Sequence, residues 1–431
     1  MYRFACSVWS VFLLLILFAF VSCVPTVKQS TSQSAFRKLT EDKGPFATFS
    51  IYHFSDDSSR VYFAFNSDAL LYVKNSVSGA FESRVSINYS LTPDWESKQI
   101  IDSGSVYFTD TVCYYGKGFV YGSFVIKSPV GQTGFVRISL FDLNRLYSEY
   151  FAIRLDKSSK GVRQDFLLRD STGAVPVFRN FLQSAESAKV SSRLLNKGAK
   201  VFVSYYRREF PLPPPPFSTQ PNKPFRYEAD SSFMLTADED SSIKLSFPAR
   251  GFYHLRLDTS LRDGFTIFRR EDDAFPEFKS VESLIPPMRY LSSRQEYDDI
   301  LYATNKKKAF DDFWLKNAGL TDRAKQLVKS YYSRARYANY FFSSHVEGWR
   351  SDRGLIYMVF GEPNVVYRDW NSETWVYGEE KSYSALSLVF MRVVNPFSDN
   401  DFQLTRSEML KDEWYKSVDT WRQGRVFNDR P

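Results

Sequence analysis

The chain has few of the residues that build most catalytic and metal centres. It contains three cysteines and three histidines in 431 residues, and His53, His254 and His345 lie far apart. It has no Gly-x-Ser-x-Gly or His-Glu-x-x-His segment, no glycine-rich phosphate loop with its lysine, and no cysteine pair with zinc spacing. These absences predict a protein that is not an enzyme and that has no metal site and no cofactor.

Two catalytic arrangements stay open. His345 lies near Glu347 and Asp352 in the sequence, and Ser343 or Ser344 would be the nucleophile of such a triad. The spacing favours this triad no more than chance does. A glycosidase pair of acidic residues is set by the fold rather than by sequence spacing. An unrecognised hydrolase is therefore kept as an alternative.

The N-terminus has the pattern of a secreted, lipid-modified protein. Arg3 is followed by the apolar run Val11–Val21, which is too short to cross a bilayer as a helix and is typical of a signal peptide over residues 1–22. Ser22 directly precedes Cys23, as a small residue does at a bacterial lipoprotein cleavage site. We predict cleavage before Cys23 and acylation of Cys23, which would anchor the protein stably. An ordinary signal peptide with an incidental cysteine is the alternative.

Composition and charge narrow the partners. Residues 23–45 are rich in polar residues without hydrophobic periodicity, which predicts a flexible tether. Cys6 leaves with the signal peptide, so Cys113 stands alone, no internal disulfide forms, and a buried apolar role is favoured. The formal charge of +7 suits an acidic partner or an anionic lipid surface. Nucleic acid is not an expected partner in this compartment.

Strand-like segments fill residues 46–156. Segment 84–91 alternates, with Val85, Ile87, Tyr89 and Leu91 on one face. Similar segments are expected at 49–54, 60–65, 70–73, 119–126, 135–141 and 150–155. Seven or so short strands without a helical stretch predict a β-sandwich of immunoglobulin-like type.

A second all-β, immunoglobulin-like β-sandwich domain is predicted for residues 157–277. Its clearest strands are expected at 200–206, 244–247 and 253–257. Between the first two lies Pro211–Phe217, here called the proline segment, which needs a polyproline-like backbone and cannot form a central strand. It is either a docking segment for an aromatic groove or, as we favour, a stiff surface loop.

The hydrophobic period changes after Pro286-Pro287 and predicts an α+β domain over residues 278–431. Ser293 and Glu296 have the spacing of a capping box, and Gly319 is placed to end a helix. Helices are expected at 293–304, 306–317, 321–342 and about 406–422, and strands at 355–360, 374–377 and 386–393.

One segment, 348–363, is unusually rich in turn formers and is here called the signature segment. Its marker residues, with one Trp from the following strand, are Gly348, Trp349, Ser351, Asp352, Arg353, Gly354, Gly361, Pro363 and Trp375. The pattern resembles the Gly-Trp-x-Thr-Asp motif of the GWxTD domain family, found in lipoproteins of Bacteroidetes-type bacteria, with Ser351 in the place of threonine. The resemblance implies an envelope protein but no particular reaction.

The signature segment has two interpretations. In the structural one, which we favour, Ser351 or Asp352 accepts backbone N–H bonds in a tight turn and Trp349 fills the core. In the other, the tryptophan-rich C-terminal domain forms an aromatic cleft, with Asp352 and Arg353 as polar anchors for a sugar or peptide.

Together these features predict a non-enzymatic, lipid-anchored accessory or scaffold subunit of an outer-membrane assembly for secretion or membrane-protein insertion, with a protein partner. A binding protein for a glycan or cell-wall fragment is the alternative beside the hydrolase. In Bacteroidetes-type lipoproteins, acidic residues just after the cysteine accompany surface export. The first acidic residue here is Glu41, so the resemblance implies that the protein faces the periplasm.

Overall fold

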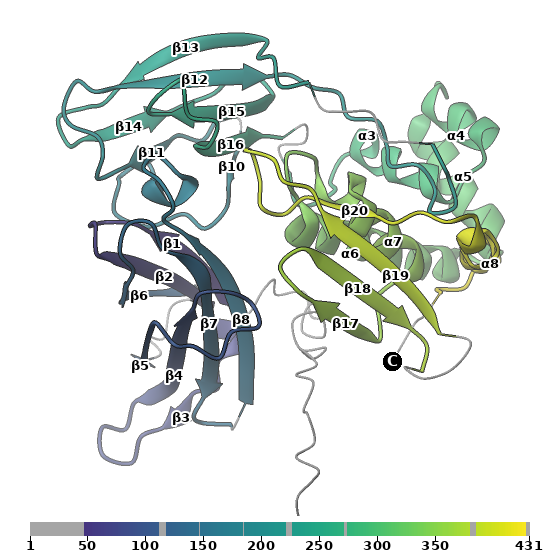
Figure 1. Cartoon of the computed structure of the whole chain (residues 1–431). Helices are drawn as coiled ribbons and strands as arrows, with labels where there is room; N and C mark the ends of the chain where they lie inside the picture. The colour runs from purple at the N-terminus through teal and green to yellow at the C-terminus, as the bar shows by residue number, and fades with distance from the viewer. Residues whose placement is uncertain are drawn as a thin grey trace, which may run out of the picture.

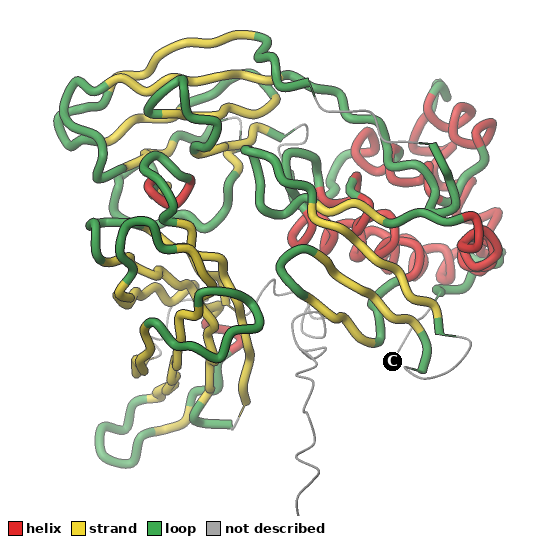
Figure 2. The backbone as a smooth tube through the Cα atoms, in the orientation of Figure 1, coloured by secondary structure: helices red, strands yellow, loops and turns green. Residues whose placement is uncertain are grey.

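The structure is a computed structural model that describes residues 47–111, 118–145, 147–183, 185–220, 226–270, 274–379 and 385–427. The predicted signal peptide, Cys23, the tether and Cys113 lie outside these ranges. Strands dominate the chain up to residue 270, and helices gather in the C-terminal part (Figure 1, Figure 2). This confirms a β-rich N-terminal part followed by a helical C-terminal region. No helix in the described ranges combines the length and the apolar character needed to cross a membrane.

The first β unit consists of two sheets around one core. One sheet has the order β1-β2-β6, and the other has the order β3-β4-β7-β8, with β5 paired to β4. The strands are β1 (Ala47–Tyr52), β2 (Ser58–Asn66), β3 (Val73–Lys74), β4 (Phe81–Thr92), β5 (Asp102–Thr111), β6 (Phe119–Lys127), β7 (Thr133–Asp142) and β8 (Tyr147–Asp156), with the 3-10 turn η1 (Ser67–Ala69). Val85, Ile87 and Leu91 are buried as predicted. The expected strand at 70–73 was wrong, since β3 begins only at Val73.

The second β unit also pairs two sheets. A five-stranded sheet has the order β10-β16-β15-β12-β13, and a three-stranded sheet has the order β14-β11-β9. The elements are η2 (Arg163–Asp165), β9 (Leu167–Arg169), β10 (Phe181–Leu182), β11 (Ala188–Ser191), β12 (Lys200–Tyr206), β13 (Ser231–Thr236), β14 (Ser242–Leu245), β15 (Gly251–Arg256) and β16 (Phe265–Arg269). The proline segment lies between β12 and β13.

The C-terminal part places helices against a four-stranded antiparallel sheet, β17-β18-β19-β20 (Figure 1). The helices are α3 (Val281–Leu284), η3 (Pro286–Tyr290), α4 (Arg294–Leu301), α5 (Lys306–Ala318), α6 (Thr321–Phe342), η4 (Gly348–Arg350), α7 (Asp352–Phe360), η5 (Glu408–Leu410) and α8 (Lys411–Arg422). The strands are β17 (Val365–Arg368), β18 (Ser372–Tyr377), β19 (Leu386–Arg392) and β20 (Phe402–Leu404).

The helix predictions before residue 343 are confirmed. Ser293 and Glu296 form the capping box of α4, and Gly319, at φ 76°, ends α5. Helix α6 has the predicted bounds and buries a stripe that includes Leu327, Tyr331 and Phe342. The last helix begins at Lys411 rather than near residue 406, because a 3-10 turn precedes it.

The predicted strand at 355–360 was wrong, because these residues belong to helix α7. All nine residues of α7 are buried, so the segment shows neither a polar face nor a helical period. A short apolar run cannot be assigned to helix or strand by periodicity alone. The local signals were nevertheless helical, since Ser351 is the N-cap and Gly361, at φ 81°, is the C-cap.

Candidate functional site

The signature segment forms a 3-10 turn, η4, followed by the buried helix α7. Ser351 joins the two and is the N-cap of α7. Its Oγ accepts a hydrogen bond from the N–H of Gly354 at 3.0 Å and donates one to the carbonyl of Gly348 at 2.7 Å. An N-cap oxygen satisfies an amide that the first helical turn would otherwise leave without a partner.

Asp352 connects the start of α7 to the sheet. Its Oδ2 accepts hydrogen bonds from the N–H of Leu404 at 2.8 Å and from Nη1 of Arg406 at 3.1 Å, and Nη2 of Arg406 donates to Oδ1. Burial raises the pKa of the Asp352 carboxyl, and Arg406 opposes that rise. Both side chains are nearly inaccessible, so loss of either would leave a buried charge without its partner.

Gly348 and Gly354 let three backbone segments meet closely. A Cβ on Gly348 would lie 1.8 Å from the carbonyl oxygen of Ala338 in α6. A Cβ on Gly354 would lie 1.9 Å from the carbonyl oxygen of Gly348. These glycines are therefore required for space: η4 passes directly against α6, and α7 starts directly against η4.

Trp349 is a core residue held by three polar contacts. Its indole N–H donates to Oε2 of Glu347 at 2.7 Å, and its backbone N–H donates to Oδ1 of Asn339 at 3.2 Å. The hydroxyl of Tyr290 donates to the Trp349 carbonyl at 2.9 Å. The Trp349 ring is buried, so it presents no exposed face to a ligand.

Arg353 lies at the centre of a buried polar cluster. Its guanidinium contacts Oε1 of Glu373 at 3.1 Å and donates to the Asn400 carbonyl at 3.0 Å, and it lies 4.2 Å over the Phe402 ring. The other carboxylate oxygen of Glu373 accepts from the indole of Trp375 at 3.1 Å. Burial lowers the pKa of Arg353. Burial alone would raise the pKa of Glu373, but Arg368 and Arg353 hold it below its usual value.

The far end of α7 is closed by two other helices. Gly361 takes a positive φ, and a Cβ there would lie 2.6 Å from the Arg334 guanidinium of α6. The carbonyl of Val359 accepts from the indole of Trp421 in α8 at 2.9 Å. Pro363, which is also buried, follows where the helix has ended. The structure thus divides the marker residues into a cluster at each end of α7, with Trp375 joined to the first through Glu373.

Sequence reasoning missed the partners of these residues. Arg406, Asn400 and Asn339 are distant in sequence and carry no local signal. Glu373 did carry a local signal, because it alternates with Trp375 and Tyr377 along β18 and all three are buried. An acidic residue on the buried face of a strand indicates a cationic partner in the core.

Residues 251–423 match the GWxTD domain family. The chain contains a GWxTD domain. The match begins at Gly251, the first residue of β15, and so includes the last two strands of the second β unit as well as the signature segment.

No curated protein sequence matches the chain. Solved structures that match parts of it include the following two. Red sea bream transglutaminase is 9% identical with a TM-score of 0.18, over 53% of this chain and 32% of that one. Escherichia coli alpha-2-macroglobulin activated by porcine elastase is 10% identical with a TM-score of 0.12, over 50% and 21%. The chain thus spans about a third and about a fifth of these proteins, and at such TM-scores neither likeness supports a shared fold or function.

The proline segment lies on the GWxTD domain. Nη2 of Arg406 donates to the Pro214 carbonyl at 3.2 Å, and the N–H of Ser407 donates to the Pro216 carbonyl at 3.1 Å. The Phe217 ring lies 5.5 Å from the Tyr415 ring of α8. The segment is therefore a loop between two strands, as favoured, and it also docks on an aromatic surface of its own chain.

A cleft of about 650 Å³ lies beside the proline segment. Its lining includes Leu212, Phe217, Tyr290, Leu355, Trp414, Tyr415, Val418 and Arg422. Trp349, Asp352 and Arg353, expected to anchor a ligand in one interpretation, are not among the lining residues. The cleft is formed by α8, the η3–α4 connection, the proline segment and Leu355 of α7, and the turn Gly348–Arg350 does not line it.

The triad around His345 has competing contacts. Ser343 donates to the Asn339 carbonyl at 2.7 Å and accepts from the N–H of Gly348 at 2.9 Å. Nδ1 of His345 lies 3.8 Å from Oδ2 of Asp401. Burial lowers the pKa of His345 to about 4 and raises that of Asp401 to about 6. Within the described ranges, no three His, Cys, Asp or Glu residues are grouped so as to hold a metal ion.

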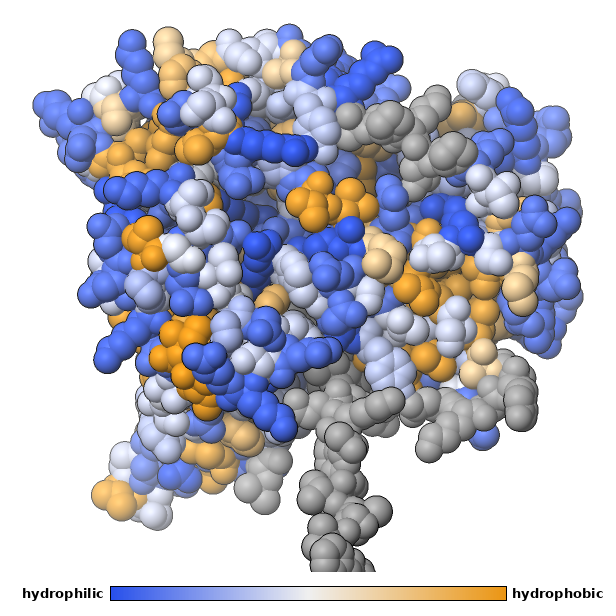
Figure 3. Space-filling model, in the orientation of Figure 1, coloured by the Kyte–Doolittle hydropathy of each residue, from blue (hydrophilic) through white to orange (hydrophobic). Residues whose placement is uncertain are grey.

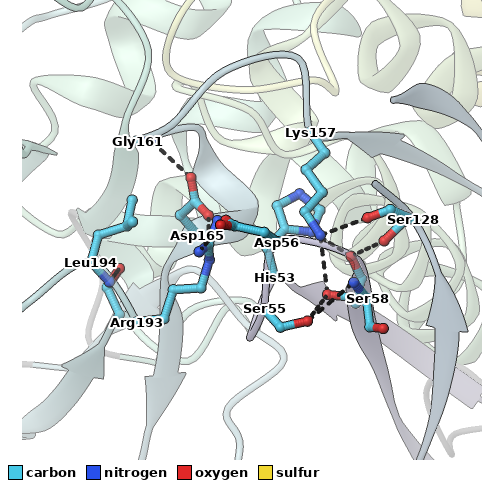
Figure 4. A network of polar contacts seen from close by, with 12 residues as sticks. His53, Ser55, Asp56, Ser58, Ser128, Lys157, Gly161, Asp165, Arg193 and Leu194 are labelled. Atoms are coloured by element: carbon cyan, nitrogen blue, oxygen red, sulfur yellow. Dashed lines mark hydrogen bonds and ion pairs between the residues drawn. The ribbon is translucent and has the colours of Figure 1, made fainter. Parts of the chain in front are cut away.

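A second buried polar network joins the two β units (Figure 4). Nζ of Lys157 donates to the carbonyls of Ser58 at 3.1 Å and Ser128 at 2.7 Å, and burial lowers its pKa. Arg193, from the second unit, bonds Asp56 of the first at 2.7 Å. The Lys157 contacts are shielded from water, whereas Asp56 is exposed, so its pair with Arg193 contributes little to holding the two units together.

Removal of the Ser351 hydroxyl is expected to weaken the start of α7. Ser351→Ala should lower the free energy of unfolding by about 0.5–2 kcal/mol, the usual cost of a lost N-cap. Ser351→Thr is the matched control, because threonine can make the same hydrogen bond. Urea unfolding followed by circular dichroism measures both. Equal stability of the alanine variant and the wild type would show that the cap contributes nothing.

Proposed function

We propose that this protein is a non-enzymatic, lipid-anchored scaffold or accessory subunit of an outer-membrane assembly, attached through Cys23 and facing the periplasm. The proposal rests on the contacts that the marker residues make within their own domain. Ser351, Asp352 and Arg353 are bound by other groups of the same domain, as described above. A motif engaged in its own fold is suited to build a stable platform, whose outer surfaces then bind partners.

Contacts between the parts of the chain support a scaffold. Trp370, in the loop between β17 and β18, lies between two arginines: Arg392 at 3.3 Å and Arg154 of β8 at 4.5 Å from the ring centre. Its ring also lies 5.2 Å from that of Phe135 in β7. The helical C-terminal part thus contacts the first β unit through Trp370. It contacts the second through the proline segment and through Phe397, which packs against Tyr206 and Phe252, and these contacts restrain the relative motion of the parts.

The family context is part of the same proposal. We infer that the two β units are immunoglobulin-like sandwiches and that the chain is one of the Bacteroidetes-type lipoproteins with this domain. Two paired sheets in each unit and the hydrophobic N-terminal segment ending at Ser22-Cys23 support this. Modules of this kind offer several docking surfaces in series, as an accessory subunit of a secretion or insertion machine needs.

Crosslinking in native membranes tests the proposal. We expect the wild-type protein to carry a fatty-acid label and to crosslink to a membrane protein in stoichiometric amount. Cys23→Ser, which cannot be acylated at this thiol, should lose the label and move to the soluble fraction. Protease added to intact cells should leave the wild type uncut, because it faces the periplasm.

Each result can contradict a different part. Equal fatty-acid label on wild type and Cys23→Ser would contradict acylation at Cys23. Cleavage on intact cells would place the protein on the cell surface. If the protein were acylated but crosslinked to no partner in stoichiometric amount, the scaffold role would be contradicted.

The absence of a stoichiometric partner would favour a second candidate function, that of a binding protein for a glycan or cell-wall fragment. The observation behind it is the cleft beside the proline segment, because Trp414 and Tyr415 line it and aromatic faces are suited to sugar rings. Retention of the protein on isolated cell-wall fragments, and its loss in Tyr415→Ala, would support that function.

A further inference from the structure

Six exposed hydrophobic side chains gather at one end of the first β unit. They are Leu71, Val73, Val77, Phe81, Phe119 and Leu143, here called the apolar tip. Figure 3 shows hydrophobic residues at the lower left end of the molecule, where Figure 1 places the β3–β4 hairpin. Clusters of exposed apolar residues mark sites of interaction with proteins or membranes.

Strand pairing and hydrogen bonds place these side chains together. Val73 pairs with Glu82 across the β3–β4 hairpin. The side chain of Asn144, next to Leu143, donates to the carbonyls of both Leu71 and Glu82 at 2.8 Å. Gly118, which directly precedes β6, is joined to the same end, because the N–H of Ser67 donates to its carbonyl at 3.0 Å.

The hairpin turn is a preformed apolar projection. Val77 is 95% exposed. Its backbone N–H bonds Oδ1 of Asn75 at 2.8 Å, and the N–H of Gly79 bonds the Asn75 carbonyl at 2.9 Å. The turn therefore satisfies polar backbone groups internally while its side chain points into solvent, which lowers the cost of entering an apolar medium.

The chain joins the first β unit at this same end. Ala47, the first residue of β1, pairs with Phe65, and the adjacent Asn66 pairs with Phe119 of the tip. The opposite end of the unit carries the His53 and Lys157 contacts that face the second β unit. A membrane anchor in the preceding residues would thus connect to the described part of the chain at the tip end.

We propose that the apolar tip inserts into the interface of the lipid bilayer. Acidic and basic side chains around it nearly balance, with Asp68, Glu82, Asp110 and Asp142 against Lys74, Arg84 and Arg145. The attraction is therefore hydrophobic, and the tip would enter to about 5–10 Å at the boundary of headgroups and acyl chains. This rests on the proposed lipid anchor for its orientation, and it would hold the first β unit against the membrane.

A pair of labels tests the insertion in the acylated protein. Val77→Cys and Val394→Cys are matched, since both valines are highly exposed, at 95% and 85%, and Val394 belongs to the GWxTD domain. Each is made with Cys113→Ser and carries an environment-sensitive fluorophore in phosphatidylcholine vesicles containing a nitroxide lipid. We expect blue-shifted, quenched emission at residue 77 and neither change at residue 394. Adding Phe81→Asp should reduce the quenching at residue 77, whereas Met409→Asp should not.

The outcomes separate the tip from the anchor. Quenching at residue 77 in protein without an acyl chain would support insertion of the tip and would show that the lipid anchor is not needed for it. Acylated, vesicle-bound protein with no quenching at residue 77 would overturn the insertion. If a crosslinker at residue 77 then captured a protein in native membranes, the tip would be a protein-binding surface instead.

Discussion

Alanine at Gly348 or Gly354 is expected to destabilise the GWxTD domain severely. The new Cβ would lie 1.8 Å from the Ala338 carbonyl oxygen in the first variant and 1.9 Å from the Gly348 carbonyl oxygen in the second. Both obstacles are backbone atoms, so no side-chain rotation relieves the clash. Overpacking a core costs about 1–3 kcal/mol and sometimes more, and we expect each variant to reach about 3 kcal/mol or exceed it.

Thermal unfolding measures this effect. A loss of about 3 kcal/mol should lower the melting temperature of a domain of this size by about 6–12 °C. Gly118→Ala is the matched control, because nothing lies within 4 Å of its new Cβ. Melting temperatures of both signature variants within a degree or two of the control would show that η4 and α6 separate easily, and would remove the structural role proposed for the motif.

The amphipathic parts of this fold could be predicted from the sequence. Helix α6 has one buried stripe and one solvated face, so its period of 3.6 residues is visible and its bounds were predicted correctly. The pair β18 and β19 was predicted for a similar reason, since alternate residues such as Trp375 and Tyr377 face the core. Elements with two different faces often carry their own signal, although β5, whose exposure also alternates, was missed.

Elements without two different faces were mispredicted or missed. Helix α7 is buried on every side and has no periodic signal, so it was mistaken for a strand. Strand β16 is buried at all five positions and short, and β13 is exposed at almost all of its positions. Neither pattern alternates, and both strands were missed. In each case tertiary contacts decide the structure, and those contacts are not written in the local sequence.

The motif residues could be located, but their partners could not. Ser351 or Asp352 was predicted to accept backbone N–H bonds in a tight turn. Ser351 accepts such a bond from Gly354, whereas Asp352 accepts one from Leu404 in β20. The ion pair of Asp352 with Arg406 spans 54 residues, and that of Arg353 with Glu373 spans 20. Partners so far apart cannot be recognised in a single sequence, because they come together only when the chain has folded.

Mild acid is expected to destabilise this protein. All three histidines are shielded from water, and burial lowers the pKa of His53, His254 and His345 to about 4 in each case. A nearby cation adds to the effect at every site: Lys157 at His53, Arg256 at His254 and Arg270 at His345. In the unfolded chain each imidazole binds its proton with the ordinary pKa of about 6.5.

The sign of the pH dependence follows from this difference. Above about pH 6.5 the imidazoles are neutral in both states and do not affect stability. As pH falls toward 4 the unfolded chain takes up protons that the folded chain excludes, so stability is lost. A difference of about 2.5 pKa units corresponds to roughly 3 kcal/mol per histidine, which together is a large part of the 5–15 kcal/mol typical of a folded protein.

Buried carboxyls work in the other direction, because burial raises the pKa of Asp352 and Asp165 as well as that of Asp401. Burial raises the pKa of Asp401 to about 6, so the folded state holds this proton more tightly than the unfolded state, and stability is gained as pH falls below about 6. That gain offsets roughly one histidine. The net result is a loss of stability between about pH 6.5 and pH 4, with the midpoint of urea unfolding falling steadily.

Urea unfolding at pH 7, 6, 5 and 4.5 measures the loss, and histidine variants assign it. His254→Gln should reduce the dependence on pH by about a third, because glutamine can keep hydrogen bonds of the kind that His254 makes with Thr266 and the Arg262 carbonyl but carries no titrating group. Met409→Gln, at an exposed position, is the control and should keep the full dependence. If stability were the same at pH 7 and pH 5, the imidazoles would have to be protonated inside the fold.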